Sequence, residues 1–157
     1  MRFQTKDALD LFNFEEVTIR GIDAGADCVT VVMDALIAKG NNPSNEECED
    51  RFVDTANVRF KDAHITKIIK EGYRYYDANG KLTEEKPDEE VSLMAYDSVL
   101  KKCKDVCLFD LIAGKDRADG HIYELGIDLN ESDTCWITIS CKETVVEWEK
   151  FMNRVMK

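Results

Sequence analysis

Apolar and polar residues alternate with a period of two over much of the chain, and this pattern predicts a protein built mainly of β-strands. Residues 17–22 and 28–37 flank a turn at residues 23–27 and are expected to form a hairpin. The second run is rich in β-branched residues and apolar at both parities, as expected of a strand covered on both faces. Later runs predict three further strands, separated by segments rich in Gly, Asp, Asn and Ser: Val106–Ala113, residues 121–129 and Thr134–Cys141.

One nine-residue pattern occurs twice, at residues 14–22 and 60–68. Each copy has Phe first, an acid third, Val or Ala fourth, and Ile sixth and ninth. In a flat strand the first and fourth side chains would point to opposite faces of the sheet. We therefore interpret each copy as a strand with a bend or bulge at each end, which turns all four apolar side chains inward. Chance similarity between two short apolar runs is the alternative.

A second hairpin is predicted around Asn79 and Gly80, because Asn-Gly tolerates the positive φ angles of a tight turn. We expect residues 58–82 to form strands joined by two tight turns.

Helical spacing of apolar residues appears in two places. Residues 87–90 start with Pro and three acids, as a helix N-terminus does, and apolar residues then recur every three or four positions: Leu93, Tyr96, Leu100 and Cys103. Residues 142–156 carry a second apolar stripe, which predicts a C-terminal helix packed on a sheet: Val145, Trp148, Phe151, Met152 and Val155. Thr5 is also a candidate cap for a short helix over residues 6–12.

These elements predict one α+β domain over residues 1–157. Antiparallel β-structure dominates it, as a sandwich or a curved sheet or roll, with two amphipathic helices, the last at the C-terminus.

The chain carries 32 acidic and 21 basic residues, for a net charge of −11. Such a charge repels nucleic acid and anionic membranes and favours a basic protein partner. No leader segment and no apolar run of membrane-spanning length is visible, so a cytoplasmic protein is expected.

Little in the sequence indicates chemistry. The six cysteines form no Cys-x-x-Cys pair, so we expect reduced thiols, no metal and no cofactor. The two histidines, His64 and His121, belong to no metal or catalytic motif, so no catalytic residue is assigned. With 32 carboxylates, acidic pairs such as Asp110 and Asp128 occur by number alone.

Four aromatic residues on predicted strands are candidates for lining a ligand groove: Tyr73, Tyr75, Tyr123 and Trp136. Packing between neighbouring strands is the alternative role for them.

The pattern at residues 60–68 resembles the opening strand of small bacterial β-rich proteins, some of which are grouped with immunity proteins of toxin systems. From Phe14 through residues 148–151, Trp-Glu-Lys-Phe, the chain is similar to an uncharacterised β-rich family of unknown function from anaerobic Gram-positive bacteria. The shared motifs are structural, so this resemblance implies a fold and transfers no active-site residue.

Two functions are therefore expected. The first is a non-enzymatic binding or interaction protein, with an immunity or adaptor role, whose acidic surface docks a basic partner. Its acidic residues would include Glu46, Glu47, Glu49 and Asp50. The second is a small-molecule binder or enzyme with an aromatic-lined pocket between sheet and helix. A homodimer through an edge strand is compatible with either.

Overall fold

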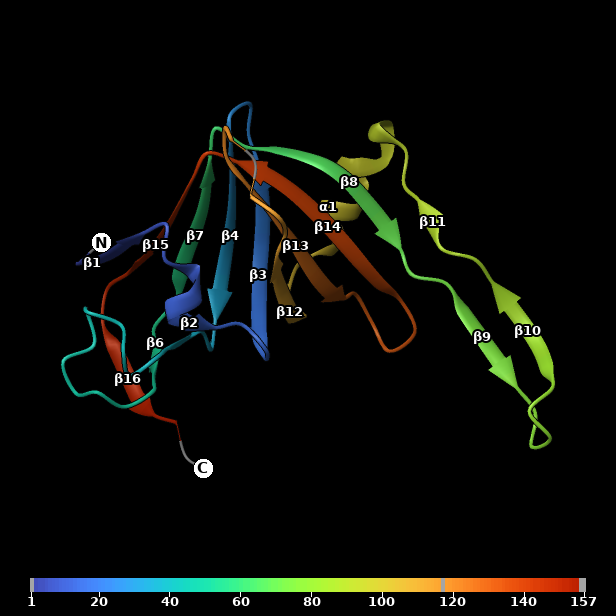
Figure 1. The fold of residues 1–157 in the computed structure, drawn as a ribbon, viewed down its shortest axis with the longest axis horizontal. Coiled ribbons are helices and arrows are strands. Elements are labelled where there is room, and N and C mark those ends of the chain that lie inside the picture. The colour runs from blue at the N-terminus through green and yellow to red at the C-terminus, as the bar shows by residue number, and fades with distance from the viewer. Residues whose placement is uncertain (1, 117, 156–157) are drawn as a thin grey trace.

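A ten-stranded antiparallel sheet dominates the computed structural model, which describes residues 2–116 and 118–155 (Figure 1). Its strands, in spatial order, are β1 (Phe3–Lys6), β15 (Glu143–Trp148), β7 (Ala56–Lys61), β4 (Cys28–Asp34), β3 (Val17–Ala24), β12 (Val106–Ala113), β13 (His121–Asp128), β14 (Thr134–Cys141), β8 (His64–Lys70) and β11 (Glu89–Glu90). The expectation of a mainly antiparallel β protein is confirmed.

The remaining strands of the described residues form two smaller sheets. One contains, in spatial order, β16 (Phe151–Arg154), β6 (Arg51–Val53), β5 (Ile37–Ala38) and β2 (Phe12–Asn13). The other is the hairpin of β9 (Tyr73–Tyr76) and β10 (Leu82–Lys86), whose turn places Gly80 at φ 79° as the Asn-Gly pair predicts.

The large sheet bends back on itself. Strands β7 and β8 lie six places apart in the sheet order, which would separate them by about 29 Å in a flat sheet. Only Asp62 and Ala63 connect them, and two residues cannot span that distance. Residue Lys142 alone likewise connects β14 to β15. The two halves of the sheet therefore face each other, and the core fills the space between them.

Each copy of the doubled pattern, residues 14–22 and 60–68, contains a break in the β-structure and a β-bulge. Glu15 and Glu16 form a turn before β3, and Asp62, with φ 49°, separates β7 from β8. Pairing registers then shift at Arg20 in β3 and at Thr66 in β8, the seventh position of both copies. All eight apolar side chains are buried or half-buried. The interpretation as bent strands agrees with this arrangement.

The prediction of two amphipathic helices is wrong. Residues expected to form the C-terminal helix instead form β15 and β16. Of the earlier helix only α1 (Tyr96–Lys102) is α-helical, preceded by the 3-10 turn η2 (Leu93–Ala95), while Glu89 and Glu90 pair with β8. The helix expected over residues 6–12 is reduced to the 3-10 turn η1 (Leu9–Leu11).

Helix α1 packs against β3 and buries Val99, Leu100 and Cys103. The Cys103 thiol, directly after the helix, meets that of Cys135 on β14, so one face of the helix covers the core of the bent sheet. No helix in the described part of the chain has the length and apolar character needed to cross a membrane.

Candidate functional site

The structure separates the four aromatic residues that the sequence predicts as ligand contacts. Tyr73 and Tyr75 lie on the β9–β10 hairpin, which extends away from the body of the protein (Figure 1). Trp136 contacts Phe109 edge-to-face on the outer side of the sheet, with ring centroids 5.4 Å apart. Tyr123 alone of the four borders a cavity between the N-terminal segment and strands β12 and β13.

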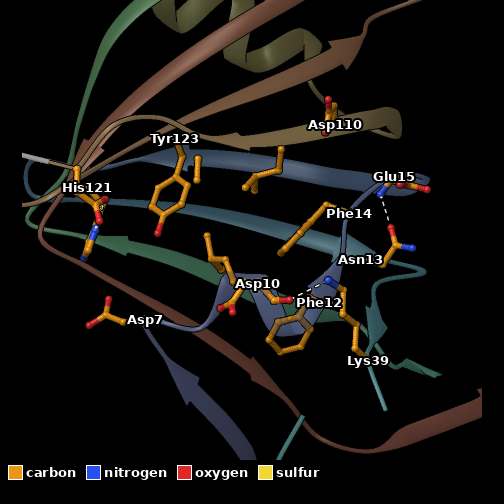
Figure 2. A pocket seen from close by; sticks show the side chains of 14 residues that line it. Asp7, Asp10, Phe12, Asn13, Phe14, Glu15, Lys39, Asp110, His121 and Tyr123 are labelled. Carbon is orange, nitrogen blue, oxygen red and sulfur yellow. Dashed lines mark hydrogen bonds and ion pairs between the residues drawn. The ribbon is translucent and has the colours of Figure 1, made fainter. Parts of the chain in front are cut away.

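This cavity has a volume of about 550 Å³, which is within the usual range for small-molecule sites. Figure 2 shows Tyr123 and His121 on one side of it, with Asp7 and Asp10 across from them on the N-terminal segment. Its lining residues are Asp7, Leu9, Asp10, Phe12, Asn13, Phe14, Glu15, Lys39, Asp110, Leu111, Ala113, Asp116, His121 and Tyr123.

The floor of the cavity is apolar and firmly held. Leu9, Phe12 and Phe14 are buried there. The Phe12 ring meets the fully buried Trp148 ring edge-to-face at 5.5 Å, and it also contacts the Phe14 ring. Strand β2 pairs with β5, so the segment that carries these side chains is fixed to the small sheet. A preformed apolar surface of this kind suits the hydrocarbon part of a ligand.

Five carboxylates surround this floor, against one lysine. Two of them already have partners: Asp7 Oδ1 accepts a hydrogen bond from the Thr144 amide at 2.9 Å, and Asp116 Oδ1 lies 2.9 Å from His121 Nδ1. Within the described ranges, the other three carboxylates have no hydrogen bond or ion pair with another side chain or amide: Asp10, Glu15 and Asp110. As far as the described residues go, the cavity therefore offers unpaired negative charge to a ligand.

The lysine of the cavity bonds to the backbone and forms no ion pair with these carboxylates among the described residues. Lys39 Nζ donates a hydrogen bond to the backbone carbonyl of Asp10, at 2.9 Å (Figure 2). This contact ties β5 to the N-terminal segment and leaves the Asp10 carboxylate without a cationic partner in the described residues.

A thiol, an imidazole and a carboxylate come together at one end of the cavity. Cys141 lies opposite His121 in the register of β13 and β14, and Asp116 Oδ1 lies 2.9 Å from His121 Nδ1. Burial and the Asp7 carboxylate raise the pKa of the Cys141 thiol to about 11. Because the nucleophile in cysteine catalysis is the thiolate, this thiol is inert at neutral pH.

Tyr123 is a neutral hydrogen-bonding group at this site. Burial raises the pKa of its phenol, and the nearby Cys141, Asp116 and Asp7 raise it further. The ring of Tyr123 also packs 5.8 Å from that of Phe60, so its position depends on the core.

Sequence reasoning did not predict this group of residues as a site. Tyr123 was the one lining residue predicted as a ligand contact, Phe14 belonged to the doubled pattern, and Asp7 and Phe12 carried no motif. Residues from three separate parts of the chain meet here only because the sheet bends, and no spacing along the sequence reports that.

The acidic loop of the first functional hypothesis is largely engaged in local contacts. Glu47 forms an ion pair with Arg51 at 3.5 Å, and Asp50 accepts a hydrogen bond from the Gly40 amide at 2.9 Å. Glu46 and Glu49 are exposed in the same loop.

Within residues 2–116 and 118–155, no three His, Cys, Asp or Glu side chains are grouped so as to hold a metal ion. Comparisons with protein-family models, with curated proteins and with solved structures found no match. The candidate site is therefore argued from its own geometry.

Proposed function

We propose that this protein binds a small organic cation in the cavity between its N-terminal segment and strands β12 and β13. The observation that carries the proposal is an apolar, aromatic floor beneath five carboxylates, three of which lack a partner among the described residues. The ligand class that fits is an amine or guanidine attached to a hydrocarbon or aromatic body.

Two physical effects favour such a ligand. An unpaired carboxylate beside a partly enclosed cavity attracts a cation more strongly than one in bulk water, because the effective dielectric constant is lower. Aromatic faces, here Phe14 and Tyr123, add cation–π attraction. An anionic ligand would meet the same carboxylates and the net charge of −11 as repulsion.

Titration with phenethylamine, followed by calorimetry and by ¹H–¹⁵N NMR, tests the proposal. Phenethyl alcohol has nearly the same shape without the charge and is the matched ligand control. We expect the amine to bind more tightly, with chemical shifts changing around residues 7–15 and 110–123. Equal binding of the amine and the alcohol, or shifts elsewhere only, contradicts a cation site.

Variants of the protein identify the carboxylates involved. Asp10→Asn and Asp110→Asn should each weaken amine binding by roughly threefold, as expected for one partly exposed charge pair. Glu131→Gln removes one exposed carboxylate outside the cavity and should leave binding unchanged. Equal weakening in all three variants would indicate a general charge effect and not a site.

The second candidate function is an interaction protein, with an immunity or adaptor role, that docks a basic partner. The observation that favours it is a group of exposed apolar side chains in one segment between β8 and α1. We further propose a reducing, cytoplasmic location, which the six unpaired thiols support.

A further inference from the structure

Exposed apolar side chains are concentrated in one insertion of the described chain. Eight large hydrophobic residues are exposed, and six of them lie between β8 and α1: Tyr73, Tyr75, Tyr76, Leu82, Leu93 and Met94. Tyr75 is 56% exposed and Met94 is 98% exposed. Four of the six lie together on the β9–β10 hairpin, and Leu93 and Met94 follow beyond β11. Apolar groups exposed together mark interaction surfaces, since scattered single ones are ordinary.

The hairpin in this insertion projects from the body and is internally ordered (Figure 1). Strands β9 and β10 pair only with each other among the described strands. The Tyr73 hydroxyl donates to Glu84 Oε1 at 2.9 Å, and Arg74 forms an ion pair with Glu85, also at 2.9 Å. At the base, the Gly72 amide donates to Asp88 Oδ1 at 2.7 Å. The hairpin therefore presents its tyrosines on an ordered support.

Its two faces carry different groups. Tyr73 and Tyr75 share one face, with ring centroids 4.8 Å apart, and Glu84 lies beside them. Tyr76 and Leu82 are paired across the other face. Exposed tyrosine rings next to a carboxylate suit an arginine, because the guanidinium group stacks on an aromatic face and pairs with a carboxylate at its edge.

The charge of the segment indicates the kind of partner. Residues 71–90 carry seven acids and three basic residues; the acids are Glu71, Asp77, Glu84, Glu85, Asp88, Glu89 and Glu90, and the basic residues are Arg74, Lys81 and Lys86. A second copy of this chain would bring like charges together at the hairpin, which opposes self-association there.

We propose that residues 71–94 form a docking surface for a basic protein, which lays arginine side chains on the exposed faces of Tyr73 and Tyr75, beside Glu84. This proposal rests on the second candidate function, the docking of a basic partner, and is independent of the cation site in the cavity. The exposed Leu93 and Met94 supply an apolar contact at the end of the same insertion.

The test uses the full-length, ¹⁵N-labelled chain and the peptide acetyl-Arg-Val-Arg-Val-Arg-amide. Acetyl-Glu-Val-Glu-Val-Glu-amide is the charge-reversed control. We expect the basic peptide alone to shift the amide signals of residues 71–94. The double variant Tyr73→Ser/Tyr75→Ser should weaken this binding by roughly tenfold, and Met152→Ser, which removes an exposed apolar side chain elsewhere, should not.

Three results would overturn the proposal. Equal amide shifts with the basic and the acidic peptide would show that charge does not select the partner. Shifts confined to residues 7–15 and 110–123 would place the peptide in the cavity instead. A concentration-dependent dimer in sedimentation velocity, lost in the double tyrosine variant, would make a second copy of the chain the occupant.

Discussion

The rings of Phe60 and Tyr123 pack with their centroids 5.8 Å apart, although they come from strands β7 and β13 in opposite halves of the bent sheet. Phe60 is fully buried, whereas Tyr123 reaches from the core to the cavity. This contact joins the closure of the sheet to the wall of the candidate site.

The substitution Phe60→Ala is therefore expected to weaken both the closure of the sheet and the wall of the candidate site. Truncation of a buried Phe leaves a cavity and lowers the free energy of unfolding by about 3–5 kcal/mol. Urea denaturation followed by tryptophan fluorescence measures this change. Tyr75→Ser, on the exposed hairpin, is the control and should leave the unfolding midpoint unchanged. A loss below about 1 kcal/mol would show that the two halves do not depend on this contact.

Gly72 allows two segments to approach closely at the base of the hairpin. A Cβ at this position would overlap the Lys86 carbonyl oxygen and the Pro87 backbone. Gly72→Ala should loosen the hairpin, so amide exchange of residues 73–86 should accelerate while the global melting temperature changes little. Gly21→Ala is the matched control, because its Cβ would meet nothing within 4 Å. Unchanged exchange in the Gly72 variant would contradict the close approach.

The free energy of unfolding should depend on pH because the buried thiol of Cys141 ionises. Its pKa is raised from 9.0 to about 11 in the folded state, so folding favours the protonated form. The resulting stabilisation is present below pH 9 and is lost as the pH rises to about 11. The loss amounts to about 2–3 kcal/mol, and the raised pKa of Tyr123 adds to the decline above pH 10.

Urea unfolding at pH 8, 9, 10 and 11 measures this decline. Cys141→Ala should flatten it, whatever the variant's stability at pH 8, while Cys48→Ala, which removes an exposed thiol, should retain the wild-type profile. Parallel profiles for wild type and Cys141→Ala would mean that Cys141 does not titrate as described.

Thiol labelling should follow exposure and pKa. Cys48 is exposed and should react first with iodoacetamide at pH 8. Cys107 is exposed as well, but desolvation and the nearby Asp128 and Glu16 raise its pKa, so it should react more slowly. The buried thiols of Cys103, Cys135 and Cys141 should react only after unfolding. Peptide mass spectrometry over time measures the order, and rapid labelling of Cys135 would contradict the packing of α1.

Local sequence patterns predicted the strands most accurately where a run of β-forming residues has turn residues at its ends. The predicted ranges of β12 and β14 agree with the structure residue for residue, and that of β13 differs by one residue. Strand β14 shows clean period-two alternation, β12 is a short apolar run, and turn residues separate these strands, so local sequence was enough to choose a strand.

The C-terminal segment shows why the same reasoning failed elsewhere. Val145 and Trp148 fit a helical stripe, but β15 lies between β1 and β7 and buries residues on both faces. Its connection to β16 depends on Asp54, whose Oδ1 accepts hydrogen bonds from the amides of Glu149 and Lys150. A partner 95 residues away along the chain leaves no trace in local periodicity.

The sequence by itself determined the extended segments over residues 17–34 and 106–141, together with the tight turn at Asn79 and Gly80. Those properties arise from side-chain alternation and backbone preference, which act between near neighbours. Only the tertiary structure decided that the sheet closes on itself and that Asp7, Phe14, Asp110 and Tyr123 share one cavity. Such a site depends on pairing between distant strands, and the corners that produce this pairing are specified by contacts across the whole core.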